Sequence, residues 1–106
     1  SVSGLPADSF TFFGFLPHKK GKQTILSEIL ESKKTSVFYE SPHRILKTLN
    51  MLKELSESSN INKKIVIARE LTKMFEQIVS GDVDEVIKYF EDNSDKVKGE
   101  FVVVVN

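Results

Sequence analysis

The stretch FYESPHR at residues 38–44 decides how this chain folds, because it leaves a strand and enters a helix within one turn. Ser41 is a favourable helix N-cap residue and Pro42 suits the first helical position, so the stretch predicts that a helix begins at Pro42. His43 and Arg44 then fall at the positive end of the helix dipole, where a cation costs roughly 0.3–1 kcal/mol. We therefore expect these two cations to face an anion, either Glu40 or a ligand.

Hydrophobic patterns on both sides of this stretch predict alternating strands and helices. Gly14 within the first strand indicates a β-bulge, and Asp82 with Glu85 forms a capping box for the last helix. Four consecutive valines at 102–105 indicate a strand in the centre of the sheet. The expected strands are residues 10–16, 35–40, 64–69, 76–80 and 100–105, and the expected helices are residues 23–32, 42–58 and a third helix after Asp82. This order predicts an α/β fold, a three-layer-like sandwich with a mixed sheet of about five strands and three helices.

Size and composition bound the classes of protein that the chain can represent. Its 106 residues suffice for one domain with a modest core, so residues 1–106 are expected to form a single domain. The net charge is zero, so any contact with nucleic acid must come from a local patch. The absence of cysteine and the wide separation of the two histidines, together with no apolar run of about 20 residues, predict no metal site and no membrane span. The first residues read like the middle of a longer protein, so we expect a C-terminal fragment whose N-terminal domain is absent.

Polar side chains also follow the strand at 64–69, in the stretch ARELTK at residues 68–73. Loops at the ends of strands are where α/β folds build binding sites. Two interpretations stay open for this stretch: a solvated hairpin with Arg69 and Glu70 in local ion pairs, or one wall of a binding site. The stretch at 38–44 has the same two interpretations, because a Glu40–Arg44 pair and an anion pocket are both compatible with its residues.

Two further stretches are weaker candidates for a site. The basic loop HKKGK at residues 18–22 could contact phosphates, although lysines on a loop are usually only solvated. The phenylalanines at positions 10, 12, 13 and 15 could form a platform for stacking bases, although we expect core packing for them. The sequence contains no Ser-His-Asp arrangement and no glycine-rich phosphate loop, so it assigns no catalytic residue.

These stretches, taken in order, resemble the C-terminal half of a known family. The family is that of the bacterial small-subunit ribosomal RNA (cytidine-2′-O-)-methyltransferases, within the tetrapyrrole (corrin/porphyrin) methylase superfamily. Each motif alone is weak, whereas their common order along nearly the whole chain is fairly specific. The matching segments are SGLP at 3–6, FFGFLP at 12–17 with Lys19, FYESPHR at 38–44, ARELTK at 68–73 with Glu76 and Gly81, and KGEFVVVV at 98–105.

The resemblance implies a cytoplasmic, homodimeric methyltransferase of two α/β domains, with S-adenosylmethionine bound in the cleft between them and ribosomal RNA as substrate. This chain would supply one wall of the donor site. The residues implied at the donor are Tyr39, Glu40, Arg69, Glu70 and Leu71. The residues implied at the RNA, or in support of the loops, are Lys19, His43, Arg44 and Lys73. Glu40 and Glu70 are conceivable general bases.

Two alternatives to this function remain open. A tetrapyrrole methyltransferase of the same superfamily is less favoured, because Glu40 and Leu71 stand where those relatives often carry an apolar residue and a glycine. A non-catalytic binding or dimerisation module is the other alternative. We expect the isolated chain to be inactive and to bind the donor weakly at best, since the other walls of the pocket belong to the missing domain.

Overall fold

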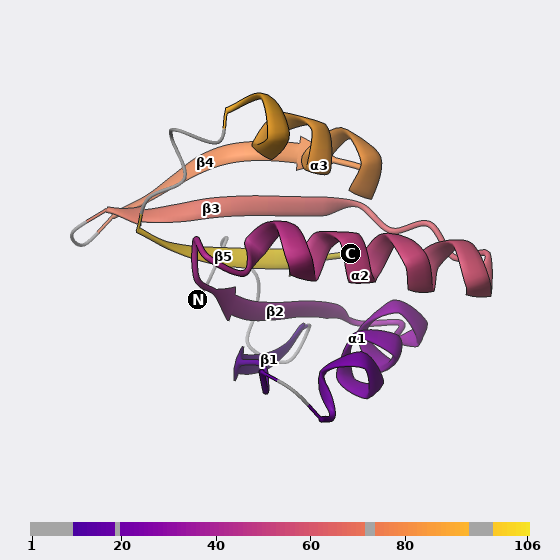
Figure 1. The fold of residues 1–106 in the computed structure, drawn as a ribbon. Helices are drawn as coiled ribbons and strands as arrows, with labels where there is room; N and C mark the ends of the chain where they lie inside the picture. Colours follow the sequence, from indigo (N-terminus) through magenta and orange to yellow (C-terminus); the bar gives the residue numbers. More distant parts are fainter. Residues whose placement is uncertain (1–9, 19, 72–73, 94–98) are drawn as a thin grey trace.

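The computed structural model describes residues 10–18, 20–71, 74–93 and 99–106, with the side chains of 71–75 left aside. Its elements form one mixed sheet and three helices (Figure 1), which confirms the expected α/β class. In chain order they are β1 (Phe10–Phe15), α1 (Lys22–Glu31), β2 (Thr35–Glu40), α2 (Ile45–Ser59), β3 (Ile65–Leu71), β4 (Met74–Gly81), α3 (Val83–Asp92) and β5 (Glu100–Val105).

The five strands lie in the order β1-β2-β5-β3-β4, so the valine-rich strand β5 is central, as predicted. β1 and β2 are parallel, and β5 is antiparallel to both of its neighbours, β2 and β3. It follows that β1, β2 and β3 run in the same direction and that their C-terminal ends meet at one edge of the sheet. β4 returns antiparallel to β3, so it begins at that same edge.

All three helices pack against one face of the sheet and share one core with it (Figure 1). The helices contribute apolar residues at helical spacing to this core, as their sequence patterns predicted. On the opposite face, a smaller cluster of Val37, Val102 and Val104 packs with Phe10, Tyr39 and Val66. The described residues therefore form two layers, helices and sheet, in place of the three-layer character expected. The buried core residues of the helices are Leu26, Ile29, Leu30, Ile45, Leu49, Leu52, Val83, Val86, Ile87 and Phe90.

The start of α2 differs from the prediction. The helix begins at Ile45, Arg44 occupies the N-cap position without a side-chain cap, and residues 42–44 form a turn. Ser41 is not the cap, because its Oγ makes no hydrogen bond in the described structure, and its carbonyl accepts the backbone N–H of Arg44 at 3.1 Å in a single turn. The regular helix therefore begins three residues later than the sequence signal predicted.

Strand boundaries agree with the sequence patterns closely in the interior of the sheet and less closely at the hairpin. β2 and β5 have the predicted limits, whereas β4 is longer than the expected 76–80 because it pairs with β3 along its full length. The register between β1 and β2 shifts between Phe12 and Gly14, and Gly14 has φ of 68°, which confirms the predicted bulge. A positive φ of this size favours glycine over any residue with a Cβ.

The capping box at the start of α3 is formed as the sequence predicts. The Asp82 carboxylate accepts the backbone N–H of Glu85 at 2.9 Å, and the Glu85 carboxylate accepts the backbone N–H of Asp82 at 3.1 Å. Replacement of Asp82 by alanine removes this cap and is expected to lower the free energy of unfolding by about 1 kcal/mol in urea titrations. Asp92→Ala at the other end of the same helix is the control. An equal loss in both variants would contradict a specific contribution from the cap.

Candidate functional site

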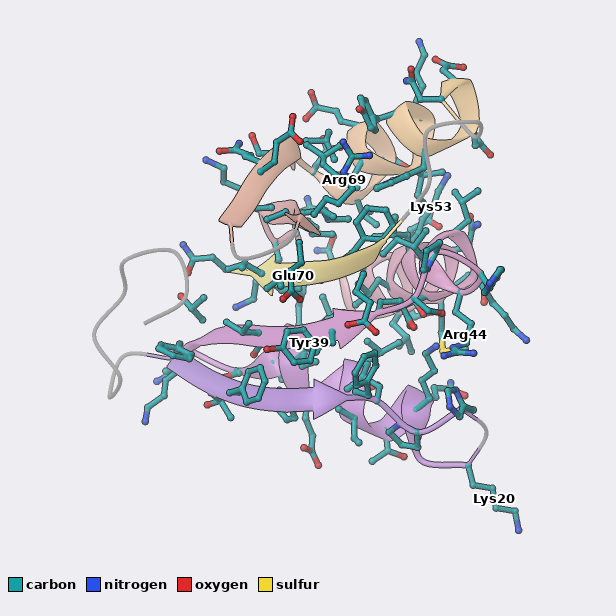
Figure 2. The ribbon with its side chains drawn as sticks, turned by 90° about the vertical axis from the view of Figure 1, so that its left-hand side faces the viewer. Lys20, Tyr39, Arg44, Lys53, Arg69 and Glu70 are labelled. Carbon is teal, nitrogen blue, oxygen red and sulfur yellow. The ribbon has the colours of Figure 1, made fainter. Side chains whose placement is uncertain are left out.

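The edge where β1, β2 and β3 end carries most of the residues that the sequence singled out. Figure 2 looks onto this edge, with Tyr39, Arg69 and Glu70 labelled on it. In the register of the sheet, Glu40 and Arg69 lie on either side of Phe101, and Tyr39 and Ala68 lie on either side of Val102. Glu70 is opposite Glu100 one step further out. The structure therefore brings the ends of β2 and β3 together on one rim, with the start of β5 between them.

The alternation of side chains along a strand divides this rim between the two faces of the sheet. Glu40 points to the helix-covered face, where it contacts Lys22 of α1 and Thr48 of α2. Arg69 shares that face, since it pairs with Glu76 and lines a cavity with residues of α3. Tyr39 packs with the cluster on the opposite face, which we call the helix-free face because none of the helices in the described residues packs on it. By alternation Glu70 lies on the helix-free face too, so this face is where an incoming ligand meets fewer elements of the chain itself.

Glu40 is the centre of a buried polar cluster that ties together β2, α1 and α2. The residue is 3% exposed, and Lys22, at 4%, places its Nζ 3.1 Å from Oε2. Thr48 Oγ1 donates to the same oxygen, while the backbone N–H of Ser41 donates to Oε1. Arg44 Nε lies 3.4 Å from Oε1. The anion that balances Arg44 is therefore Glu40, and the interpretation of a local pair in the 38–44 stretch is confirmed.

The pKa of the Glu40 carboxyl is lowered below its ordinary value. Burial alone raises this pKa, but the hydrogen bonds from Thr48, Ser41 and Lys22 and the charge of Lys22 outweigh it. A lowered pKa means that the folded state holds the charged form more tightly than the unfolded chain does. A carboxylate of this kind, with its oxygens occupied, is a weak base, so Glu40 is unsuited to accept a proton from a substrate.

Because protonation of Glu40 is linked to folding, its lowered pKa makes the stability of the chain depend on pH. The contribution of Glu40 is present above the pKa of the unfolded chain, near 4.5, and is lost as pH falls through the folded value. We expect the difference in unfolding free energy between the native chain and Glu40→Gln to be largest at pH 7 and to shrink toward pH 3. Urea titrations at both pH values measure this difference. A difference independent of pH would show that the carboxylate charge contributes nothing.

The remaining residues of the sequence-based site lie in different surroundings. Arg44 is partly exposed at the start of α2, and His43 beside it is exposed in the turn. Lys19 and Lys73 lie outside the described residues, and of Leu71 only the backbone position at the end of β3 is described. The structure thus describes six side chains of the predicted site, and the four on the ends of β2 and β3 split between the two faces of the sheet.

A cavity of about 170 Å³ lies between α3 and the β3–β4 hairpin on the helix-covered face. Arg69 borders it, with Arg69 Nη2 3.3 Å from Glu76 Oε2. Sequence reasoning missed the partners from α3, because they are distant in the chain and lie on a helix with an ordinary amphipathic pattern. The cavity is lined by Arg69, Glu76, Gln77, Ile78, Tyr89, Phe90 and Asn93.

Three aromatic rings on the helix-free face form what we call the aromatic patch, namely Phe12, Phe15 and Tyr39. The Tyr39 ring centroid is 5.2 Å from that of Phe12 and 5.3 Å from that of Phe15. The expectation of core packing is right for Phe13, which packs on the main core, and for Phe10, which packs on the smaller cluster. It is wrong for Phe12 and Phe15, which are 49% and 50% exposed. Phe12 lies on the face opposite the helices by simple alternation from Phe10, and the register shift between Phe12 and Gly14 brings Phe15 to the same face.

The described residues contain neither a metal-binding cluster nor a membrane-spanning helix. No group of three or more histidine, cysteine, aspartate or glutamate side chains there is arranged to hold a metal ion. Among the helices of that part of the chain, none has the length and apolar character needed to cross a membrane.

Fold and site together define an α/β domain with helices on one face of a mixed sheet and a rim of polar and aromatic side chains where three strands end. Curated relatives then give the resemblance a name: the chain is homologous to the C-terminal part of proteins called "Ribosomal RNA small subunit methyltransferase I". It is 42% identical to the protein from Vibrio cholerae and 36% identical to that from Rickettsia prowazekii, in both cases over 100% of this chain. The Halalkalibacterium halodurans protein is 42% identical over 98% of the chain.

The chain matches only part of the length of each of these relatives. The chain spans 36% of the length of the Vibrio and Rickettsia proteins and 34% of the Halalkalibacterium protein. No family model matches the chain. The similarity therefore confirms the resemblance seen in the sequence motifs, and it extends over a region equal to about a third of each of these relatives.

Proposed function

We propose that this chain is the C-terminal part of an S-adenosylmethionine-dependent methyltransferase that acts on small-subunit ribosomal RNA. The observation that carries the proposal is the similarity over the full chain, at 36–42% identity, to proteins named for that activity. We propose further that the target is the ribose 2′-hydroxyl of a cytidine. We also propose that the whole enzyme is a cytoplasmic homodimer with an N-terminal domain that supplies the opposite wall of the donor site. These finer features rest on the motif resemblance.

The rim residues fit a donor of this kind. Tyr39 offers an aromatic surface, and Glu70 offers an exposed carboxylate that can accept hydrogen bonds from ribose hydroxyls. Gly99 approaches the end of β3 closely: a Cβ built on it would lie 3.4 Å from the Glu70 backbone oxygen, and its φ of 77° favours glycine. We assign Tyr39, Glu70 and the backbone at Leu71 to direct contact with the donor.

Glu40 and Arg69 take a supporting part in this proposal. Both were expected at the donor, and both point to the helix-covered face, where their partners are residues of this chain. Glu40 holds the turn after β2 in place through Ser41 and Arg44. Arg69 holds the hairpin through Glu76. Their backbone positions shape the rim, so these residues position the site without contact between their side chains and the donor.

When bound, S-adenosylmethionine supplies an electrophilic methyl group on a sulfonium, and transfer to a hydroxyl requires in-line placement and loss of the hydroxyl proton. The chain contributes a fixed rim for that placement, because the Glu40 cluster locks the end of β2 to two helices. His43 and Arg44, together with Lys19 and Lys73, are proposed to contact the phosphates of the RNA. With Glu40 excluded as a base by its occupied oxygens, Glu70 is the remaining carboxylate of this rim among those that the motifs indicated.

The proposal is tested with the full-length protein that contains this chain. Incubation with donor labelled in its methyl group and with small-subunit RNA is expected to transfer the label to a cytidine ribose, located by digestion and mass spectrometry. Glu70→Gln is expected to raise the KM for the donor about fivefold or more, while Glu57→Gln on the exposed face of α2 leaves it unchanged. A pure, folded protein that labels no RNA would overturn the function. The isolated chain is expected to bind the donor with worse than micromolar affinity in calorimetry.

A further inference from the structure

The aromatic patch is an unusual surface for a strand that faces solvent. Phe12 and Phe15 are the exposed large hydrophobic side chains among the described residues, and each shows about half of its surface. An alternating strand of a soluble domain normally places polar side chains at such positions. The third ring, Tyr39, lies between the other two, edge-on to Phe12 and tilted against Phe15. The result is a continuous aromatic surface across β1 and β2.

We propose that the aromatic patch binds unpaired bases of an RNA strand by stacking. A sheet with helices on one face and exposed aromatic rings on the other is a recurrent solution for binding single-stranded RNA, because bases stack on the rings without a change in the sheet. The inference rests on the proposed function for the class of substrate. Tyr39 belongs both to the rim and to the patch, whereas Phe12 and Phe15 add a surface for bases that the rim residues do not provide.

The distribution of charge around the patch favours a nucleic acid on the β1 side. The loop after β1, in which His18 and Lys20 are exposed, leads to α1, and Lys20 extends into solvent on the side of the helices, away from Tyr39 (Figure 2). The carboxylates on the same face, Glu70 and Glu100, belong to β3 and β5, which β2 separates from β1. An RNA backbone that passes along β1 therefore avoids these two carboxylates.

The size of the patch fits bases better than it fits a protein partner. Two half-exposed phenylalanines present on the order of 200 Å² of surface. A specific protein–protein interface buries about 800 Å² on each partner. The patch is thus large enough for one or two bases and too small, on its own, for a second copy of this chain.

A single tryptophan provides a direct test, because the chain has none. In the 106-residue chain carrying Phe12→Trp, addition of a single-stranded pyrimidine oligoribonucleotide is expected to quench the tryptophan fluorescence by stacking. The matched control is Tyr89→Trp on α3, which lies on the helix-covered side. Circular dichroism and cooperative urea unfolding verify that both variants are folded. Equal quenching in the two variants, or none in Phe12→Trp, would overturn the proposal.

Ring-preserving and ring-removing variants give the second test. Phe12→Leu with Phe15→Leu keeps two apolar side chains but removes the rings, and it is expected to weaken oligoribonucleotide binding tenfold or more in fluorescence anisotropy. Phe12→Tyr with Phe15→Tyr keeps the rings and is expected to retain the affinity within about twofold. Equal affinity in the two double variants contradicts stacking. Sedimentation that shows a dimer dissociated by the leucine substitutions would assign the patch to a second copy of the chain and overturn the proposal.

Methylation assays on the full-length protein separate this inference from the proposed function. Loss of RNA affinity in the leucine double variant, seen as a raised KM for RNA with the KM for the donor unchanged, supports the stacking role. Unchanged kinetics in that variant would end the stacking proposal and leave the methyltransferase assignment intact. If the protein binds oligoribonucleotides through these rings but transfers no methyl group to RNA, the stacking proposal stands and the methyltransferase assignment is overturned.

Discussion

Replacement of Glu40 by glutamine is expected to lower the free energy of unfolding by about 3–5 kcal/mol, the usual cost of removing one partner from a buried ion pair. The variant keeps the shape of the side chain but leaves the Lys22 ammonium, 4% exposed, without its counter-ion. The Thr48 hydroxyl and the Ser41 N–H donate to different oxygens of Glu40, so at most one of them finds the single amide oxygen of glutamine as its acceptor. Since a domain of this size is stable by roughly 5–15 kcal/mol, the loss is a large share of the total.

A second substitution isolates the charge from the packing. Lys22→Met combined with Glu40→Gln removes both charges and replaces the buried ammonium by an apolar chain of similar length. The double variant is expected to regain most of the stability lost in Glu40→Gln, because the unpaired charge is the main penalty. Urea unfolding of the native chain, both single variants and the double variant completes the cycle. If the losses in the single variants simply add, Lys22 and Glu40 do not depend on each other.

The Glu40 cluster also shows why the sequence predicted the rim but not the faces of its residues. The strands at 35–40 and 100–105 follow from runs rich in β-branched and aromatic residues, and both have the predicted limits. Polar residues at the strand ends are visible in the same way, so the edge could be located. Which face each side chain takes depends on the position of the helices, and the partner that fixes Glu40 is Lys22, 18 residues earlier. No local pattern contains that information.

Two other differences have similar causes. Ser41 and Pro42 carry a strong signal for a helix start, but Ser41 Oγ caps no backbone N–H and residues 42–44 form a turn before the helix begins at Ile45. Phe12 and Phe15 look like core residues by composition, but both lie on the face opposite the helices, and the bulge at Gly14 is what brings Phe15 to the face of Phe12. In contrast, the helical faces and the capping box of α3 depend on residues three or four apart, so sequence periodicity alone predicted them.

The division of the rim between two faces has a consequence for the enzyme that we propose. Residues on the helix-covered face, such as Glu40, hold the elements together, and their substitution should affect stability first. Residues on the helix-free face, such as Glu70 and Phe12, do not hold the helices to the sheet, so their substitution should mainly weaken ligand binding. Measurements of unfolding and of binding on the same set of variants can therefore separate structural from functional residues along a single edge.

Phe38 and Phe12 allow that separation to be tested with the same chemical change, phenylalanine to alanine. Phe38 on β2 is fully buried and belongs to the main core, so Phe38→Ala is expected to cost about 3–5 kcal/mol of unfolding free energy through lost burial and the cavity left behind. Phe12 on the neighbouring strand is 49% exposed on the other face, and Phe12→Ala is expected to cost about 1 kcal/mol or less. Urea unfolding of both variants measures the contrast.

The two substitutions should separate in the opposite order when RNA binding is measured. Phe12→Ala is expected to weaken oligoribonucleotide binding while the domain stays folded. A stability loss for Phe12→Ala as large as that for Phe38→Ala would mean that the aromatic patch is part of the core. Because the two residues differ in the face of the sheet that they occupy, the contrast tests whether that face separates stability from binding.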